Sequence, residues 1–373
     1  MDSRLFLSFA HLWRKHCSPL LKYLKVCSGA RIRVFTISAS KSEEKSTIHP
    51  ILLMCFIVLA FVPFLPLSAA AEEMRIGYLR HWPTPNLYDG AYKTLDPILN
   101  TSVQWYAFDT GAEIADAMAA GEIDIAYGQG VTPFVKAVSE GLDIVTIGIA
   151  LSYAENDNCV VHEDAAIDKT NAQELEGQKV AVPFGSVPHY KLLKQMEHLE
   201  VDHRKIELLD KTPNEGAEAL ANAEVAMACG FGGGFIEMLE YGEVLLSAQE
   251  LADIGIYVFD VIAVTKIFAT EKPDWVQAFL QVTEDSNHAF AENPEKFLEP
   301  LANMSEQSVE VTTAQLQSFI FPSKSEVLNR WFNGSVGRFY HGVAVTLHEA
   351  GFLNTVLEDY AVMIDRSFLE SIN

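Results

Sequence analysis

An acidic residue, Asp260, interrupts the apolar stretch IGIYVFDVIAV, which spans residues 254–264. A carboxylate buried in such a strand costs several kcal/mol unless it is paired. The ammonium group of a ligand would be one suitable partner, and a structural lysine or backbone N–H groups would be the other. Asp157, in the segment AENDNCVV, is a second carboxylate at a strand end. We include Asp157 and its neighbour Asn158 in a candidate binding site.

Three turns, each between an expected strand and the following helix, are suited to binding an anion. They are FDTGA (108–112), GQGVTP (128–133) and VPFGS (182–186). Backbone N–H groups at a helix start lack partners within the helix, and together with the helix dipole they attract anions. Ordinary capping explains any single turn, but three turns that follow strands lining one cleft favour an anion site. The candidate residues are Thr110, Gly111, Gln129 and Gly130.

The sequence around these turns contains few basic residues, although a phosphate or dicarboxylate site normally uses Arg or Lys. Two aromatic residues in loops could cover a cation instead: Trp82 in RHWPTP and Phe231 in GFGGG. A ring face over a cation contributes ~0.5–2 kcal/mol, and packing in the core is the alternative for both rings. His189 begins a helix beside the third turn. As a neutral imidazole it could donate to an anion, and a position facing solvent is the alternative.

Sequence motifs of the common enzyme classes are absent from the chain. Ser186 lies outside a G-x-S-x-G frame, the glycines of residues 230–234 fail the dinucleotide pattern, and no Walker or H-E-x-x-H motif occurs. No Cys or His spacing indicates a metal site. Cys159 and Cys229 are the two cysteines after residue 71. They could form a disulfide in an oxidising compartment or remain two buried thiols.

Short apolar segments alternate with amphipathic ones, which is typical of an α/β protein. The expected strands are 74–78, 103–108, 123–127, 143–151, 179–182, 205–209, 224–228 and 257–264, and helices follow Pro273. The late strand at 257–264 indicates that the chain returns to its first half. We therefore expect two lobes, each a sheet flanked by helices, with a hinge crossed twice and a ligand in the cleft between them.

The expected boundaries divide the chain into four parts. Residues 1–71 form an N-terminal extension with a signal peptide, residues 72–158 the first part of lobe 1, residues 159–258 lobe 2, and residues 259–373 the return to lobe 1 with C-terminal helices. The apolar run at 51–67 is followed by small residues, which predicts cleavage near Ala71. A membrane anchor is the alternative reading of this run. The true start of translation within residues 1–50 stays open.

The chain carries 27 Lys and Arg against 50 Asp and Glu, but residues 1–71 hold nine of the basic and only three of the acidic ones. The remainder therefore has 18 basic and 47 acidic residues and a net charge of −29. Such a surface repels nucleic acid and anionic lipid. We therefore exclude nucleic acid as a partner.

Three segments resemble the periplasmic binding components of taurine ABC transporters. They are FDTGAEIADAMAAGEIDIAYGQGVTPFVKAVSEG (108–141), VAVPFGSVPHYKLL (180–193) and VFDVIAVTKIFATEKPDWV (258–276). The likeness extends from about Met74 to the C-terminus. It implies a type II periplasmic-binding fold whose cleft holds taurine, with the sulfonate at one end and the ammonium group at the other.

The resemblance also implies roles for individual residues. Asp260 corresponds to the partner of the ammonium group, and Asp157 takes the place of a second acid that is usually Glu. The sulfonate would lie among the turns at 110–111 and 129–130, with His189 near the lobe 2 end. The loop ACGFGGG departs from members with an aromatic-rich loop there. Hypotaurine, a longer aminosulfonate or another small zwitterion therefore remains an open alternative to taurine.

The implied function is that of a monomeric solute-binding component in the periplasm, which delivers its ligand to an ABC permease in the inner membrane and uses no cofactor. Two alternatives stay open. One is a binding protein for an alkanesulfonate or nitrate, which would have no use for Asp260 facing the ligand. The other is an enzyme similar to thiamine-pyrimidine synthase, a family with a cysteine-rich motif that this sequence lacks. A sensor without a transporter also remains open.

Overall fold

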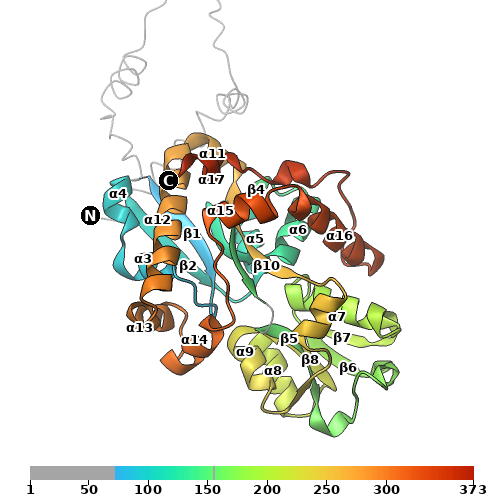
Figure 1. Ribbon diagram of the computed structural model, residues 1–373. Helices are drawn as coiled ribbons and strands as arrows, with labels where there is room; N and C mark the ends of the chain where they lie inside the picture. The colour runs from blue at the N-terminus through green and yellow to red at the C-terminus, as the bar shows by residue number, and fades with distance from the viewer. Residues whose placement is uncertain (1–71, 154–155) are drawn as a thin grey trace, which may run out of the picture. The chain divides into compact units, whose positions relative to one another are not determined.

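A computed structural model describes residues 72–153 and 156–373. The predicted signal peptide lies outside the described residues. Within the described part, no helix is both long and apolar enough to cross a membrane. Figure 1 shows two sheets, one from the blue and green strands with orange β10, and one from the green and yellow strands.

The first sheet has the strand order β2-β1-β3-β10-β4. Its members are β1 (Glu73–Leu79), β2 (Ser102–Phe108), β3 (Ile125–Gly130), β4 (Ile144–Tyr153) and β10 (Val258–Thr265). β1 is parallel to β2 and β3, whereas β10 lies antiparallel between β3 and β4. The return of the chain through β10 confirms the topology expected from the sequence.

The second sheet repeats this arrangement, with the order β7-β6-β8-β5-β9. Its strands are β5 (Asp157–His162), β6 (Lys179–Val182), β7 (Glu207–Asp210), β8 (Met227–Phe231) and β9 (Gly242–Val244). β6 is parallel to β7 and β8, and β5 is antiparallel to β8 and β9. The chain therefore passes between the sheets twice, before β5 and before β10. We call each sheet with its helices a lobe.

The helices of lobe 1 come from several parts of the sequence; some pack on the first sheet and others, such as α13 and α14, pack on neighbouring helices (Figure 1). They are α3 (Leu87–Tyr92), α4 (Leu95–Leu99), α5 (Gly111–Ala120), α6 (Val131–Ser139), α11 (Lys266–Glu271), α12 (Pro273–Glu292), α13 (Glu295–Met304), α14 (Val309–Leu316), α15 (Lys324–Glu326), α16 (Ser335–Glu349) and α17 (Ser367–Ser371). Lobe 2 has α7 (Val187–His198), α8 (Pro213–Ala221), α9 (Gly232–Met238) and α10 (Ala248–Asp253).

The alternation of side chains along the strands of lobe 2 explains why helices cover both faces of its sheet. On β6, Val180 and Val182 belong to one apolar cluster, and Ala181 between them belongs to another. Successive residues of a strand point to opposite faces, so each face needs its own cover. The first cluster includes Leu192 and Met196 of α7, and the second includes residues of α8 and α9.

Cys159 and Cys229 stand directly opposite each other in the antiparallel pair β5–β8 and form a disulfide. Both cysteines are almost completely buried. The structure thus decides between the two alternatives that the sequence left open. The bond joins the two strands whose ends carry Asp157 and Phe231, which are also register partners.

Two expected strands of lobe 2 begin later than the sequence pattern suggested. β7 starts at Glu207 because residues His203–Lys205 form a 3-10 turn, in which the Asp202 carboxylate accepts the backbone N–H of Arg204. β8 starts at Met227, because a turn with Ala223 at positive φ follows α8 and delays the strand. Both shifts come from turn geometry, which apolar periodicity does not report.

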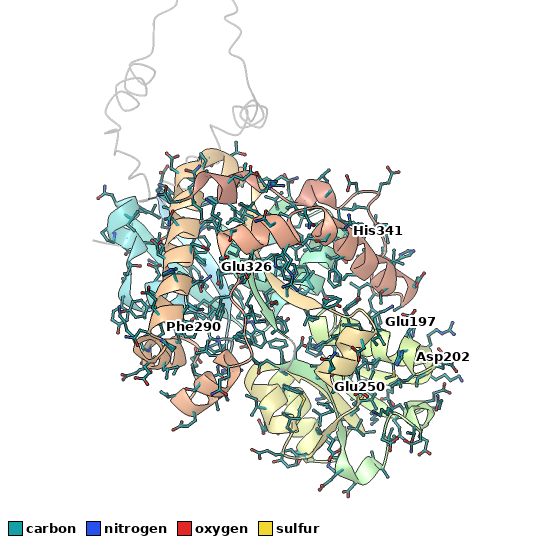
Figure 2. All side chains as sticks on the ribbon, viewed as in Figure 1. Glu197, Asp202, Glu250, Phe290, Glu326 and His341 are labelled. Carbon is teal, nitrogen blue, oxygen red and sulfur yellow. A yellow bond between two sulfur atoms is a disulfide. The ribbon has the colours of Figure 1, made fainter. Side chains whose placement is uncertain are left out.

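Acidic side chains reach the surface of lobe 2 at several elements, in keeping with the excess of Asp and Glu over Lys and Arg. Figure 2 labels Glu197 on α7, Asp202 in the loop after it and Glu250 on α10. Each of the three also has a basic neighbour at ion-pair distance. Pairs exposed to this degree contribute little to stability.

Candidate functional site

A small cavity lies where the strand ends of lobe 1 meet the start of α7 in lobe 2. Its volume is about 20 Å³, which is close to the space that one water molecule needs. The residues that line it are Leu79, Trp82, Gly111, Gly130, Pro133, Tyr153, Asp157, Ser186, Val187, Pro188, Phe231 and Asp260. Both lobes therefore contribute to a single cavity.

Asp260 is the most unusual group in this cavity. Its carboxylate is buried, with 1% of the residue exposed. The indole Nε1 of Trp82 donates to Oδ2 at 2.8 Å, and the hydroxyl of Tyr153 donates to Oδ1 at 3.0 Å. Both donors are neutral, and within the described residues no Lys, Arg or His forms an ion pair with Asp260.

Burial raises the pKa of the Asp260 carboxyl well above its ordinary value. The hydrogen bonds from Tyr153 and Trp82 oppose this shift, and the charge of Asp157 adds to it. Because removal from water is the largest cause, the ionised form lacks a compensating charge. A cation that entered the cavity would supply this charge.

The strand order explains why an acidic residue reaches this position. β10 lies between β3 and β4, and Asp260 is opposite Gly130 on one side and Leu151 on the other. The pairing of β10 with β4 shifts register just after Asp260. The neighbouring Gly128 has a φ of 73°, a conformation that favours glycine. It keeps the backbone close to both the carboxylate and the Trp82 ring.

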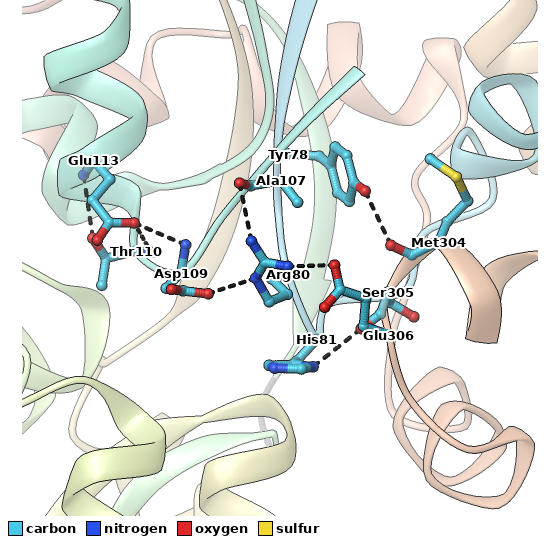
Figure 3. A network of polar contacts seen from close by, with 10 residues as sticks. All are labelled: Tyr78, Arg80, His81, Ala107, Asp109, Thr110, Glu113, Met304, Ser305 and Glu306. Atoms are coloured by element: carbon cyan, nitrogen blue, oxygen red, sulfur yellow. Dashed lines mark hydrogen bonds and ion pairs between the residues drawn. The ribbon is translucent and has the colours of Figure 1, made fainter. Parts of the chain in front are cut away.

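The loop that carries Trp82 is tied to the rest of lobe 1 by a polar network (Figure 3). The Arg80 guanidinium donates to Asp109 at the end of β2, at 2.7 Å, and also bonds Glu306 beyond α13. His81 donates its backbone N–H to the carbonyl of Ser305 at 3.1 Å. These contacts hold the residues on the N-terminal side of Trp82 and thereby set the position of its indole.

Three aromatic rings surround the Trp82 indole. Tyr153 and Phe231 both stand at 82° to it, with ring centroids 5.0 and 5.8 Å away. Phe319 packs at 4.5 Å with a tilt of 54°. Tyr153 comes from β4, Phe231 from the end of β8 and Phe319 from the loop after α14. Trp82, Tyr153 and Phe231 line the cavity, and Phe319 supports the indole from outside the lining.

A second group of lining residues belongs to helix N-termini. Gly111 is the first residue of α5, Gly130 is the N-cap of α6, and Ser186 is the N-cap of α7. A side chain at Gly111 would lie 2.5 Å from Pro133, and one at Gly130 would lie 2.9 Å from Val187. The three helix starts are thus packed closely around one point, where their dipoles favour negative charge.

Asp157 is already paired within lobe 2. The Lys191 ammonium of α7 bonds its carboxylate and also donates to its backbone carbonyl at 2.7 Å. Both side chains are buried, with 2% or less exposed. Burial raises the pKa of Asp157, and Lys191 opposes the shift. The second carboxylate oxygen, Oδ2, is buried and makes no hydrogen bond to the described residues.

Six of the ten residues proposed from the sequence line the cavity: Trp82, Gly111, Gly130, Asp157, Phe231 and Asp260. The other four lie around it. Thr110 caps α5 through its hydroxyl, and the amide of Gln129 donates to the carbonyl of Gly111 at 3.3 Å. Asn158 donates to the carbonyl of Leu246 and accepts from Cys159. These contacts support the walls rather than form them.

His189, the fourth of these residues, is fully buried between two phenylalanine rings. Phe184 stacks on its imidazole at 5.2 Å, and Phe352 approaches edge-on at 4.2 Å. Nδ1 accepts the backbone N–H of Gly185 at 3.0 Å, and burial lowers the pKa of His189 to about 4. At neutral pH the ring is uncharged, and its position links α7 to the segment that follows α16.

Six lining residues were not proposed from the sequence. Ser186, Val187 and Pro188 form the start of α7, and Leu79, Pro133 and Tyr153 belong to lobe 1. Tyr153 is the important omission, because its hydroxyl bonds Asp260. The expected strand stopped at Leu151, but β4 continues to Tyr153. The alternation of Leu151 and Tyr153 in β4 was the available clue.

The sequence is similar to one protein family and to two bacterial binding proteins. The family model described as "NMT1/THI5 like" matches residues 103–297. The taurine-binding periplasmic protein of Escherichia coli strain K12 is 26% identical over 248 residues, which are 66% of this chain and 76% of that protein. The putative aliphatic sulfonates-binding protein of the same organism is 28% identical over 158 residues, which are 42% of this chain and 49% of that protein.

Solved structures share the two-lobed fold. The periplasmic aliphatic sulphonate binding protein SsuA from Escherichia coli matches with a TM-score of 0.63 at 19% identity, over 78% of this chain and 91% of that one. The alkanesulfonate-binding protein SsuA from Xanthomonas axonopodis pv. citri bound to MOPS matches with a TM-score of 0.64 at 18% identity, over 80% and 99%. At these identities the likeness establishes the fold, which confirms the type II periplasmic-binding architecture expected from the sequence.

Proposed function

Since this chain belongs to the NMT1/THI5-like family, we propose that it is the solute-binding component of an ABC importer and that its ligand is taurine or a similar small aminosulfonate. The observation that carries this proposal is the polarity of the cavity lining. It combines Asp260, which is buried without a cationic partner among the described residues, with the N-termini of three helices. A small zwitterion would match both features.

The proposed roles follow from this polarity. The ammonium group of the ligand would lie beside Asp260, where Coulomb attraction offsets the cost of burying the carboxylate. The sulfonate would accept hydrogen bonds from N–H groups at the starts of α5, α6 and α7. The known relatives described by name as taurine-binding and sulfonates-binding support this ligand class. Micromolar affinity requires about 8 kcal/mol in total.

The same proposal covers location and partners. Relatives named as periplasmic support a place outside the inner membrane, with a membrane permease as the partner. Binding rather than catalysis is favoured, because the cavity is lined by two acids, two hydrogen-bond donors and apolar residues but no nucleophile paired with a base. We also propose that the lobe boundaries lie at residues 158 and 258 and that the protein is a monomer.

Capture would depend on relative movement of the two lobes. A cavity of about 20 Å³ is too small for a molecule of taurine's size. The start of α7 would therefore move away from α5 and α6 to admit the ligand. Closure would then remove water from both charged ends and complete the contacts.

Calorimetric titration of the exported, purified protein tests the ligand assignment. Taurine, ethanesulfonate and β-alanine are compared, because each control lacks one feature of taurine: ethanesulfonate lacks the amine, and β-alanine carries a carboxylate in place of the sulfonate. We expect micromolar or tighter binding of taurine and at least about tenfold weaker binding of both controls. Ethanesulfonate that binds as tightly as taurine would contradict the role of Asp260. Absence of binding to all three would remove this ligand class altogether.

A further inference from the structure

The ammonium side of the cavity offers two acceptors and an aromatic wall, and this combination constrains the ligand beyond the proposed function on which it rests. The carboxylate of Asp260 already accepts one hydrogen bond at each oxygen. Since a carboxylate has about four lone-pair positions, it can accept from a ligand as well. The second acceptor is Oδ2 of Asp157, which is buried and makes no hydrogen bond to the described residues.

The two carboxylates lie close enough to influence each other. Both line the same cavity, and the charge of Asp157 raises the pKa of Asp260. Lys191 compensates the charge of Asp157 but bonds only Oδ1 and the backbone carbonyl. Thus two residues that line one cavity contribute a carboxylate oxygen without a hydrogen bond among the described residues and a carboxylate without a compensating charge. Two N–H donors of a cationic nitrogen would satisfy them.

Three aromatic residues also line this space. The rings of Tyr153 and Phe231 each stand at 82° to the indole of Trp82. Ring faces attract the positive charge that an ammonium ion spreads over the carbon atoms bonded to it, and walls of several rings bind methylated ammonium groups in this way. A third N–H donor pointing at the rings of Trp82 and Phe231 would have no oxygen acceptor, whereas a methyl group there would be in favourable contact.

We propose that the ammonium subsite accepts a secondary, N-methylated ammonium group, so that the ligand class includes N-methylated aminosulfonates as well as taurine. The two N–H donors of the nitrogen bond Asp260 and Oδ2 of Asp157. The methyl group packs against Trp82 and Phe231. A quaternary nitrogen has no N–H donor and leaves both acceptors unsatisfied, so the site discriminates against it.

Calorimetric titration of the exported, purified protein with four sulfonates tests this proposal. The ligands are taurine, N-methyltaurine, N,N,N-trimethyltaurine and butane-1-sulfonate. The last has the chain length of N-methyltaurine with a methylene group in place of the charged nitrogen. We expect N-methyltaurine to bind within about threefold of taurine or more tightly, and the other two to bind at least about tenfold more weakly than N-methyltaurine.

The outcomes separate this proposal from the proposed function. Taurine binding with N-methyltaurine more than about tenfold weaker overturns the methyl subsite and leaves the proposed function standing. Butane-1-sulfonate or the trimethyl compound binding as tightly as N-methyltaurine overturns the two-donor geometry. If N-methyltaurine binds and taurine does not, the methyl subsite is supported and taurine is removed from the proposed ligands. If none of the four ligands binds, both the methyl subsite and the proposed ligand class are contradicted.

A variant pair locates the methyl contact. In Phe231→Leu one wall is lost, so the ratio of the N-methyltaurine to the taurine dissociation constant should rise about fivefold. The matched control is Phe290→Leu, because Phe290 packs against Phe297 and Phe321, away from the cavity lining (Figure 2). An unchanged ratio in Phe231→Leu, or an equal rise in the control, would place the methyl group elsewhere.

Discussion

The ligand preference of the site depends most on one buried carboxylate. The wild-type Asp260 is held by Trp82 and Tyr153, neither of which carries a charge. A neutral amide in its place would keep the shape of the side chain but lose the attraction to an ammonium group. We expect Asp260→Asn to weaken taurine binding at least about 30-fold, which corresponds to about 2 kcal/mol and is within the range for hydrogen bonds to charged groups.

Stability should respond differently from affinity in this variant. The ionised carboxylate has no cationic partner in the described protein, so its removal should leave thermal unfolding unchanged or slightly improved. Asp143→Asn is a suitable control, because Asp143 is exposed and pairs with Lys266 at the surface. Calorimetry and a thermal melt measure both quantities. Wild-type affinity in Asp260→Asn would mean that the ammonium group binds elsewhere.

The raised pKa of Asp260 also predicts a dependence on pH. Between its ordinary value of 3.8 and the raised value, the folded protein keeps a proton that the unfolded chain has lost. The stability of the ligand-free protein therefore falls as the pH rises through this range. A bound ammonium group favours the ionised carboxylate, so taurine should bind more tightly as the pH rises, and binding should release a proton.

Calorimetric titration in two buffers of different protonation enthalpy measures this proton. The apparent binding enthalpies should differ by the number of protons released per bound ligand, multiplied by the difference between the protonation enthalpies of the two buffers. Taurine itself keeps its charges across mildly acidic and neutral pH, so the released proton comes from the protein. Equal enthalpies in both buffers at every pH tested would show that Asp260 is already ionised before the ligand arrives.

At the scale of elements, the loop after β1 controls where the indole of Trp82 lies. Arg80 joins this loop to Asp109 and Glu306, and all three side chains are at least a quarter exposed. Such ion pairs add little to stability, so we expect Arg80→Met to melt close to the wild-type temperature. The indole would be less well fixed, and taurine affinity should fall several-fold. Indole fluorescence, together with calorimetry, would report both effects; an unaltered affinity would limit Arg80 to a surface role.

The disulfide is the second element-scale feature with a measurable effect. It links β5 to β8 across 70 residues of sequence, and a loop of this size corresponds to about 4 kcal/mol of stabilisation in the chain-entropy account. We expect the Cys159→Ser, Cys229→Ser double variant to unfold at lower denaturant concentration. The single variants serve as controls for the loss of each sulfur. A midpoint equal to that of the wild type would show that the two strands need no covalent link.

Elements were easier to predict from the sequence than the contacts of single residues. Apolar periodicity located the strands of both sheets, and the apolar run around Asp260 identified β10 and its interruption. The same pattern could not show that Asp157 pairs with Lys191, because these residues meet through the packing of α7 on β5. Nor could it show that His189 lies between Phe184 and Phe352, because Phe352 is far from the other two residues in the sequence. Tyr153 was not among the predicted site residues, because the end of a strand depends on the neighbouring strand with which it pairs as much as on its own residues.

At the scale of the whole molecule, the two lobes touch at the cavity through the start of α7. A side chain at Gly130 of lobe 1 would lie 2.9 Å from Cγ2 of Val187 in lobe 2. Gly130 has ordinary backbone angles (φ −53°, ψ 142°), so another residue can be placed there. Two cysteines at these positions are near enough for a disulfide. Such a bond would fix the lobes at the separation seen here.

A cross-linked protein tests whether ligand entry requires the lobes to separate. The oxidised Gly130→Cys, Val187→Cys variant should bind taurine far more slowly than the wild type, because a cavity of about 20 Å³ admits no ligand of that size. Reduction should restore binding, and the wild type treated in the same way controls for reduction of the Cys159–Cys229 bond. The single-cysteine variants measure the effect of each substitution alone. Rapid taurine binding by the oxidised protein would mean that side-chain movement at Trp82, without lobe separation, is sufficient for entry.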